Sequence, residues 1–336
     1  MLLVLIVISA GCANDQAQSK VSPKQAVKDS VSKEEPVTAN KNYIDTALYN
    51  KLQLHIANGD SSGLWPVKGP LPLPGAILPF NRIVSYYGNL YSTQMGALGE
   101  FPKDSMLRRL QGEVKKWTAA DSLIPAIPAL HYIAITAQNE PGKAGAYRLR
   151  MPFSQIDTIL NWAKEINALV FVDVQVGLST IQKELPEFDK YLALPNFHFG
   201  IDPEFSMKTG ARPGSRIGTY DAADINFVIE HMAAIVRKNN LPPKVLVIHR
   251  FTRDMVTNYK KIKLVPEVQV VMDMDGWGGP AKKEDTYKAY IYSQPVQFTG
   301  FKIFYKNDTQ RVGEKVEMQP ADVLKLTPAP VYIQYQ

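Results

Sequence analysis

The stretch 153–175, FSQIDTILNWAKEINALVFVDVQ, contains a helical pattern over 153–167 followed by an apolar run over 168–175 that ends in Asp173 and Gln175. The run is almost continuously apolar, as in parallel strands that are buried on both faces of a sheet. A helix that leads directly into such a strand is the repeating unit of α/β folds. This stretch therefore predicts a parallel sheet covered by helices.

The same alternation continues along the chain. Strand-like runs occur at 82–87, 124–132, 168–175, 196–202, 244–249, 268–273, 300–305 and 330–335. Helical patterns occur between most of them, at 105–118, 153–167, 222–239, 253–264 and 282–292, with a weaker one at 179–192 that Pro186 interrupts. Eight such strands predict an α/β fold of the (β/α)8 TIM-like barrel type that closes on its last strand. The alternative is an open doubly wound sheet, which would carry a Gly-rich phosphate loop after its first strand; no such loop follows Tyr87.

The N-terminal part of the chain differs in composition from the rest. Residues 1–12 are mostly apolar and end in Cys12, the only cysteine of the 336 residues. This segment resembles the signal segment of bacterial lipoproteins, in which the cysteine is lipid-modified; an ordinary secretory peptide is the alternative. Residues 13–41 are polar and predict a disordered tether, 42–79 predict a helix and a Pro-rich segment, and 80–336 predict the barrel domain.

This organisation predicts a protein of the bacterial cell envelope that is extracytoplasmic and bound to membrane lipid through N-terminal acylation. The net charge of +6 and the sequence pI of about 9.1 are modest, and the basic residues are scattered along the chain. The sequence has no zinc-finger, RRM or helix-turn-helix signature. We therefore expect no nucleic acid as partner, and we expect a monomer.

Polar side chains gather where the predicted strands end. Active sites of (β/α)8 barrels lie at the C-terminal ends of the strands, so this coincidence is the main functional signal in the sequence. The candidates are Tyr87, Glu100, His131, Asp173, Gln175, Asp202, Glu204, His249, Arg250, Asp273, Asp275, Trp277, Tyr305, Lys306 and Gln334. We interpret His131 as a satisfied core histidine, whereas His249 is equally suited to contact a substrate or metal or to support a neighbouring carboxylate.

Asp202 and Glu204 follow the fourth predicted strand. In an extended chain, positions i and i+2 point to the same side, so the sequence predicts both carboxyl groups on one face. Two acids held that close push their pKa values apart, which leaves one charged and the other protonated, as acid-catalysed cleavage requires. The alternative is a solvated strand end whose acids pair with Lys or Arg.

These motifs are similar to those of the chitinase-type glycosidases, barrels whose fourth strand ends in Asp-x-Glu and whose sixth carries Met-x-Tyr-Asp. The resemblance implies that Glu204 is the general acid, that Asp202 holds the N-acetyl group of the substrate, and that Asp275 steadies its nitrogen. Gly200 stands where that family carries an acid, and Met274 replaces its tyrosine. The whole sequence also resembles a group of bacterial secreted or lipid-anchored proteins that share Tyr-Tyr-Gly-x-Leu-Tyr and Val-Ile-His-Arg-Phe.

The predicted function is therefore a glycoside-hydrolase-like barrel that acts on, or binds, an N-acetylated polysaccharide without a cofactor. The expected substrate-binding residues are Tyr87, Asp173, Gln175, His249, Arg250, Asp273, Trp277 and Tyr305. Two alternatives remain open. One is a carbohydrate-binding barrel that has lost the reaction, and the other is a phosphoester hydrolase whose strand-end acids and histidines hold a divalent metal.

Overall fold

The computed structural model describes residues 43–142, 144–308 and 317–336, which belong to one compact unit. The predictions for the signal segment 1–12, for Cys12 and for the tether 13–41 fall outside the described residues. In the described ranges, no helix combines the length and apolar character that crossing a bilayer requires.

Eight parallel strands form a closed ring. In sheet order they are β1 (Arg82–Gly88), β11 (Tyr332–Tyr335), β10 (Phe298–Ile303), β9 (Val268–Met274), β7 (Lys244–Arg250), β5 (Phe197–Ile201), β4 (Leu169–Val174) and β2 (Ala126–Ala137). In an open sheet β1 and β11 would be edges, but here β1 pairs in parallel with both β11 and β2. The fold is a (β/α)8 barrel, as the sequence predicts.

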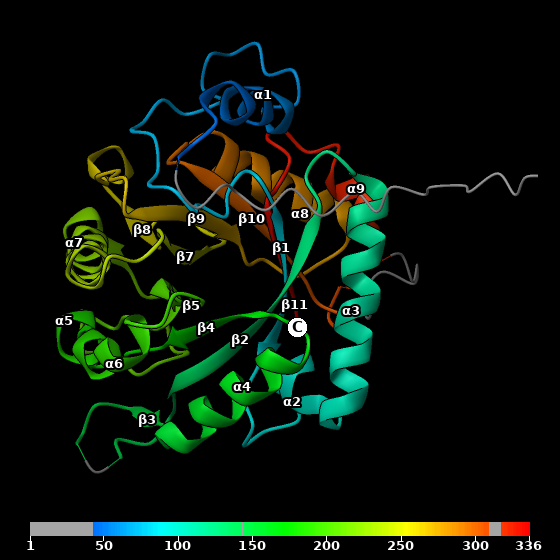
Figure 1. Cartoon of the computed structure of the whole chain (residues 1–336). Coiled ribbons are helices and arrows are strands. Elements are labelled where there is room, and N and C mark those ends of the chain that lie inside the picture. The colour runs from blue at the N-terminus through cyan, green and yellow to red at the C-terminus, as the bar shows by residue number, and fades with distance from the viewer. Residues whose placement is uncertain (1–42, 143, 309–316) are drawn as a thin grey trace, which may run out of the picture. The chain divides into compact units, whose positions relative to one another are not determined.

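Helices surround the ring (Figure 1). Buried side chains of these helices and of the strands belong to one hydrophobic cluster. The helices are α2 (Ala97–Glu100), α3 (Lys103–Ala120), α4 (Phe153–Glu165), α5 (Ile181–Glu184), α6 (Asp189–Leu192), α7 (Ala222–Asn239), α8 (Pro280–Tyr287) and α9 (Pro320–Val323). A 3-10 helix, Leu185–Phe188, separates α5 from α6 at the predicted interruption, and a π-helix, Lys288–Tyr292, extends α8. A short strand β3 (Arg148–Arg150) pairs antiparallel with β2.

The helix predicted at 253–264 is wrong. This segment contains the short strand β8 (Val256–Thr257), which pairs with β6 (Tyr220–Asp221), and a 3-10 helix, Tyr259–Lys261. The Asp221 carboxylate accepts hydrogen bonds from Thr257 Oγ1 at 2.7 Å and from Asn258 Nδ2 at 2.6 Å, and Asn258 has the left-handed φ of 54°. These tertiary contacts override the helical spacing of the apolar residues.

The interior of the barrel changes character along its axis. Towards the N-terminal ends of the strands, it is filled by apolar side chains that include Ile83, Val271 and Phe298. The same apolar cluster contains Leu52 of the helix α1 (Thr46–Ile56) and Leu78 of the Pro-rich segment, so these two segments close this end. Figure 1 shows α1 at the top, beside the ends of the strands. The opposite end is polar.

Candidate active site

A cavity of about 500 Å³ opens at the C-terminal ends of the strands, a size in the usual range of small-molecule sites. Its polar lining includes Thr136 of β2, Gln336 after β11, and six side chains that five other strands or the turns after them supply. These six are Tyr87 from β1, Gln175 after β4, Asp202 and Glu204 after β5, Asp275 after β9 and Lys302 from β10. The structure therefore brings together, in one cavity, six polar residues that lie up to about 215 positions apart in the sequence.

Asp202 and Glu204 both line this cavity, but not as two positions of one strand. β5 ends at Ile201, and Glu204 lies in the 3-10 helix Pro203–Phe205. Asp202 caps that helix, since its Oδ1 accepts a hydrogen bond from the backbone N–H of Glu204 at 3.0 Å. The expectation that an extended chain places the two acids on one strand face is wrong, because Pro203 starts a turn there.

The two carboxyl groups have perturbed acidities. Burial and, second to it, the negative charge of Asp275 raise the pKa of Glu204 to about 7, against a smaller lowering by Lys302 and His249. The pKa of Asp202 is also raised well above its ordinary value, chiefly by burial, although His249 opposes this. Gln175 Nε2 donates to Asp202 Oδ2 at 3.3 Å. The site therefore contains a protonated carboxyl group near neutral pH.

Asp275 lines the cavity and also approaches the buried side chain of His249 beneath it. Its Oδ1 forms an ion pair with Lys302 Nζ at 2.9 Å, and its Oδ2 lies 3.3 Å from His249 Nδ1. The ammonium of Lys302 also lies 4.0 Å from the centre of the Tyr87 ring, within the range of a cation–π contact. Lys302 thus fixes two walls of the cavity at once.

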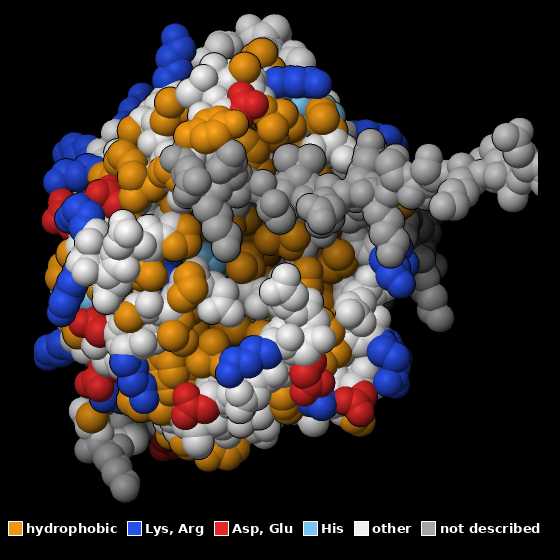
Figure 2. Space-filling view, viewed as in Figure 1, with side chains coloured by type: hydrophobic (Ala, Val, Ile, Leu, Met, Phe, Trp, Pro, Cys, Tyr) orange, Lys and Arg blue, Asp and Glu red, His pale blue; other side chains and the backbone are white. Residues whose placement is uncertain are grey.

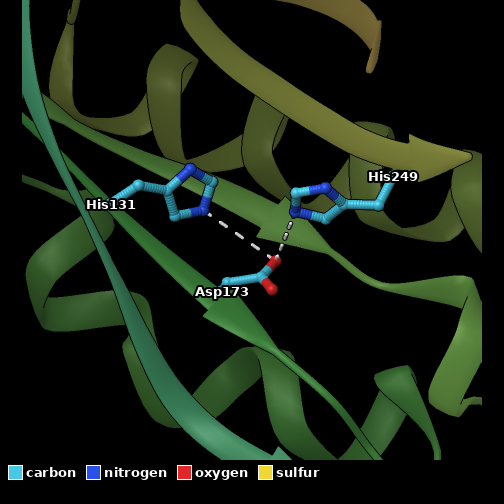
Figure 3. Close-up of side chains that lie close together, drawn as sticks. All are labelled: His131, Asp173 and His249. Carbon is cyan, nitrogen blue, oxygen red and sulfur yellow. Dashed lines mark ion pairs between the residues drawn. The ribbon is translucent and has the colours of Figure 1, made fainter. Parts of the chain in front are cut away.

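Beneath the cavity, four fully buried side chains from four strands face one another: His131, Asp173, His249 and Asp273. Tyr87 Oη donates to Asp173 Oδ2 at 2.8 Å, which links the cavity wall to this group. In Figure 3 the two histidine rings face Asp173 from opposite sides. Among the described residues, His131, Asp173 and His249 offer three metal-ligand atoms within 4.8 Å of one another.

Of the predicted substrate-binding residues, Asp173, His249 and Asp273 lie fully buried beneath the cavity, and Arg250 and Tyr305 lie outside it. The Arg250 guanidinium points away from the barrel interior and donates to the carbonyls of Thr252, Arg253, Val256 and Tyr290 and to Gln294 Oε1. It therefore holds the loop after β7. The Tyr305 ring stacks on Tyr335 at 5.0 Å and lines a different cavity, of about 430 Å³, next to α3. Both assignments are wrong because each side chain lies on the outer side of the barrel.

Sequence reasoning missed Lys302 and undervalued His131. Lys302 is 3 % exposed and is the one charged residue of β10, and this charge inside a buried run was the available signal. His131 does pack in the core, stacked on Phe171 at 5.1 Å, but its Nε2 also faces Asp173. Of the remaining candidates, Trp277 lines the cavity, and its ring is contacted by Lys282 Nζ at 4.7 Å.

No family model and no curated protein matches this chain. Among solved structures, it is similar to the cellulase Cel5C_n, with 12% identity over 80% of each chain and a TM-score of 0.44. It is also similar to the Bacillus subtilis mannanase BCman, with 14% identity over 89% of this chain and 88% of the other and a TM-score of 0.39. The YdhT protein from Bacillus subtilis shows 14% identity over 90% and 89%, with a TM-score of 0.40. At these values the likeness carries no argument about the reaction, and the barrel rests on the strand pairing.

Proposed function

We propose that this protein is a glycoside hydrolase in which Glu204 is the general acid. The observation that carries the proposal is a half-buried carboxyl group on the cavity wall whose pKa is raised to about 7. Such a group keeps its proton near neutral pH and is able to transfer it to the oxygen of a leaving sugar. Proton donation of this kind contributes about 10²–10⁴-fold to the rate.

A second carboxyl group supports this assignment. Asp275 lines the same cavity, is paired with Lys302, and interacts electrostatically with Glu204. Glycoside hydrolysis passes through a transition state with positive charge on the sugar ring, which a neighbouring carboxylate stabilises. Asp275 is suited to this role, while Asp202 is held by Gln175 at the inner wall and is suited to contact a substituent of the sugar.

The substrate we propose is an N-acetylated polysaccharide. Support comes from the likeness of Asp202, Glu204 and Asp275 to the chitinase-type motifs and from the aromatic side chains on the cavity wall. Trp277 is 38% exposed, and the partly buried Phe205 and Phe251 also line the cavity. Flat aromatic faces beside a few polar groups suit the binding of sugar rings, which are apolar on one face and hydroxylated at the edge.

We further propose that the protein is anchored on the outer side of a bacterial membrane through a lipid on Cys12. The support is the sequence of 1–12, in which an apolar segment ends at the single cysteine. On the face shown in Figure 2, Lys and Arg side chains alternate with Asp and Glu around the rim, without a broad patch of one sign.

The anchor is tested by expressing the full chain and its Cys12→Ala variant in a bacterial host and separating membrane from soluble fractions. We expect the variant to move to the soluble fraction while the unaltered chain carries the mass of a lipid. Retention of the variant in the membrane with the same yield would contradict the proposal.

The reaction is tested by measuring the release of reducing ends from peptidoglycan and chitin-like oligosaccharides between pH 4 and 8. Glu204→Gln is expected to lower turnover by about 10²–10⁴-fold with little change in substrate affinity. Glu230→Gln is the matched control, since Glu230 pairs with Lys263 on the surface. Equal turnover in all three proteins would remove Glu204 from the mechanism. Binding without cleavage by the unaltered protein would favour a carbohydrate-binding barrel.

A further inference from the structure

The buried group below the cavity converges on a single oxygen atom. His131 Nε2 lies 3.9 Å and His249 Nε2 lies 3.5 Å from Asp173 Oδ1, and all three side chains are fully buried. They come from β2, β7 and β4, respectively. Figure 3 shows both dashed lines ending on the same carboxylate oxygen, with one imidazole on each side. The three strands therefore present three donor atoms to one small volume.

None of these three atoms makes a hydrogen bond. His131 Nε2, His249 Nε2 and Asp173 Oδ1 are all buried without a hydrogen-bond partner, although the distances to Asp173 are short enough for ion pairs. Each buried polar atom left unpaired destabilises a fold, and natural proteins contain few of them. A single cation between the three would satisfy all of them. We propose that His131, Asp173 and His249 bind one divalent transition-metal ion beneath the floor of the cavity.

Gly200 supplies the room for this ion. It lies on β5 beside Asp173, and a Cβ atom at this position would stand 2.6 Å from Asp173 Oδ1 and 2.6 Å from His131 Nε2. Metal–ligand distances for imidazole nitrogen and carboxylate oxygen are about 2.0–2.2 Å. The space left by the missing side chain is therefore close to coordination distance from two of the proposed ligands. Any other residue at this position would fill it.

The outer atoms of His249 and Asp173 face polar neighbours. His249 Nδ1 lies 3.3 Å from Asp273 Oδ2 and 3.3 Å from Asp275 Oδ2, and Tyr87 Oη donates to Asp173 Oδ2 at 2.8 Å. A carboxylate on the far nitrogen of a histidine is the usual way in which proteins orient an imidazole towards a metal.

His131 also faces polar neighbours. Its Nδ1 lies 2.6 Å from Tyr332 Oη, so the tautomer with a proton on Nδ1 leaves the lone pair of Nε2 directed at the site. Gln334 Nε2 also approaches this nitrogen, at 3.1 Å, and the two orientations of its amide suit either tautomer. Metal binding therefore fixes the Nδ1–H form of His131.

Charge and donor type select the class of ion. Asp173, Asp273 and Asp275 are acids at or next to the site, and the paired Lys302 offsets one of them. Two imidazoles with one carboxylate suit Zn²⁺ and related first-row ions, whereas Ca²⁺ and Mg²⁺ prefer oxygen ligands. A tetrahedral ion holds its ligand atoms about 3.3–3.6 Å apart. The two histidine nitrogens lie 3.9 and 3.5 Å from Asp173 Oδ1, and all three atoms lie within 4.8 Å of one another, so binding requires them to move closer together.

The test uses the purified full chain, stripped of metal with a chelator, reloaded with Zn²⁺ and dialysed. Inductively coupled plasma mass spectrometry is expected to find about one equivalent of zinc per chain. Asp173→Asn, which keeps the size of the side chain, is expected to lower the retained zinc at least about tenfold. Binding does not depend on the role of Glu204, so Glu204→Gln should keep the full equivalent, and loss of glycosidase activity would leave this result unaffected.

The matched control is His198→Gln, because His198 is also a fully buried barrel histidine but lies outside the group. Full zinc in His198→Gln with loss in Asp173→Asn supports the site. Zinc content that is unchanged by Asp173→Asn, or no retained zinc in the unaltered chain, overturns it. If Asp173→Asn does not fold, X-ray absorption at the zinc edge of the unaltered chain decides: a first shell with two imidazoles supports the proposal, and a shell without imidazole overturns it.

Discussion

The two ends of the barrel interior differ in the polarity of the side chains that fill them. At the N-terminal end, Ile83, Val271 and Phe298 form an apolar core that α1 and the Pro-rich segment close. At the C-terminal end, His249 and Asp273 lie just as deeply buried, yet neither ring nitrogen of His249 and neither carboxylate oxygen of Asp273 makes a hydrogen bond.

Within one ring of strands, the apolar end stabilises the fold, whereas the polar end carries the residues proposed for catalysis and metal binding. Burying apolar surface stabilises the fold, whereas burying unpaired polar atoms destabilises it. Strand β9 shows both, since Val271 belongs to the apolar core and Asp273, two residues further, belongs to the polar end. The polar group stays in position because the apolar end and the helix layer hold the same strands.

The largest expected effect on stability is at the apolar end. Phe298→Ala removes an aromatic ring that is 1% exposed, and such truncations cost about 3–5 kcal/mol through lost burial and the cavity left behind. Urea unfolding followed by fluorescence measures the change. Leu54→Ala is the control, because Leu54 on α1 is 67% exposed and its truncation should change stability by less than about 0.5 kcal/mol. A similar small change in Phe298→Ala would break the comparison.

A smaller effect of opposite sign is expected at the polar end. The folded-state pKa of Glu204 is raised from 4.5 to about 7, so its carboxyl group favours folding at low pH and this contribution is lost as the pH rises through about 7. The Gln side chain of Glu204→Gln does not ionise, so this variant does not lose stability in this way as the pH rises. We expect the variant to gain about 2–3 kcal/mol relative to the unaltered chain on going from pH 5 to pH 8.

Unfolding both proteins in urea at several pH values between 5 and 8 measures this gain. A stability difference between them that stays constant with pH would show that Glu204 is ionised as easily in the folded chain as in the unfolded one. The polar end would then lack the protonated acid on which the proposed reaction depends.

The smallest expected effect is at the rim of the cavity. Trp277→Ala removes an aromatic face that is only partly buried, so we expect stability within about 0.5 kcal/mol of the unaltered chain. Loss of one stacking contact of about 1 kcal/mol should raise KM about fivefold and leave kcat unchanged. Steady-state kinetics on an oligosaccharide separates the two constants, and an equal loss in kcat would place Trp277 in the reaction itself.

The sequence by itself determined the strands and the end of the sheet that carries the chemistry. The eight predicted runs all correspond to barrel strands, because a short apolar run between helical patterns is a local property of the chain. It also identified Tyr87, Gln175, Asp202, Glu204, Asp275 and Trp277, which the structure collects in one cavity.

Only the tertiary structure decided which side chains point inward. These strands are buried on both faces, so their sequences lack the alternation that would tell inside from outside. His249 and Arg250 are adjacent in sequence and were both predicted to bind substrate. In the structure, His249 faces Asp173, whereas Arg250 holds a loop outside the barrel. Which residues of a strand face the barrel interior depends on the register of that strand against its neighbours. This register is established only when the ring closes.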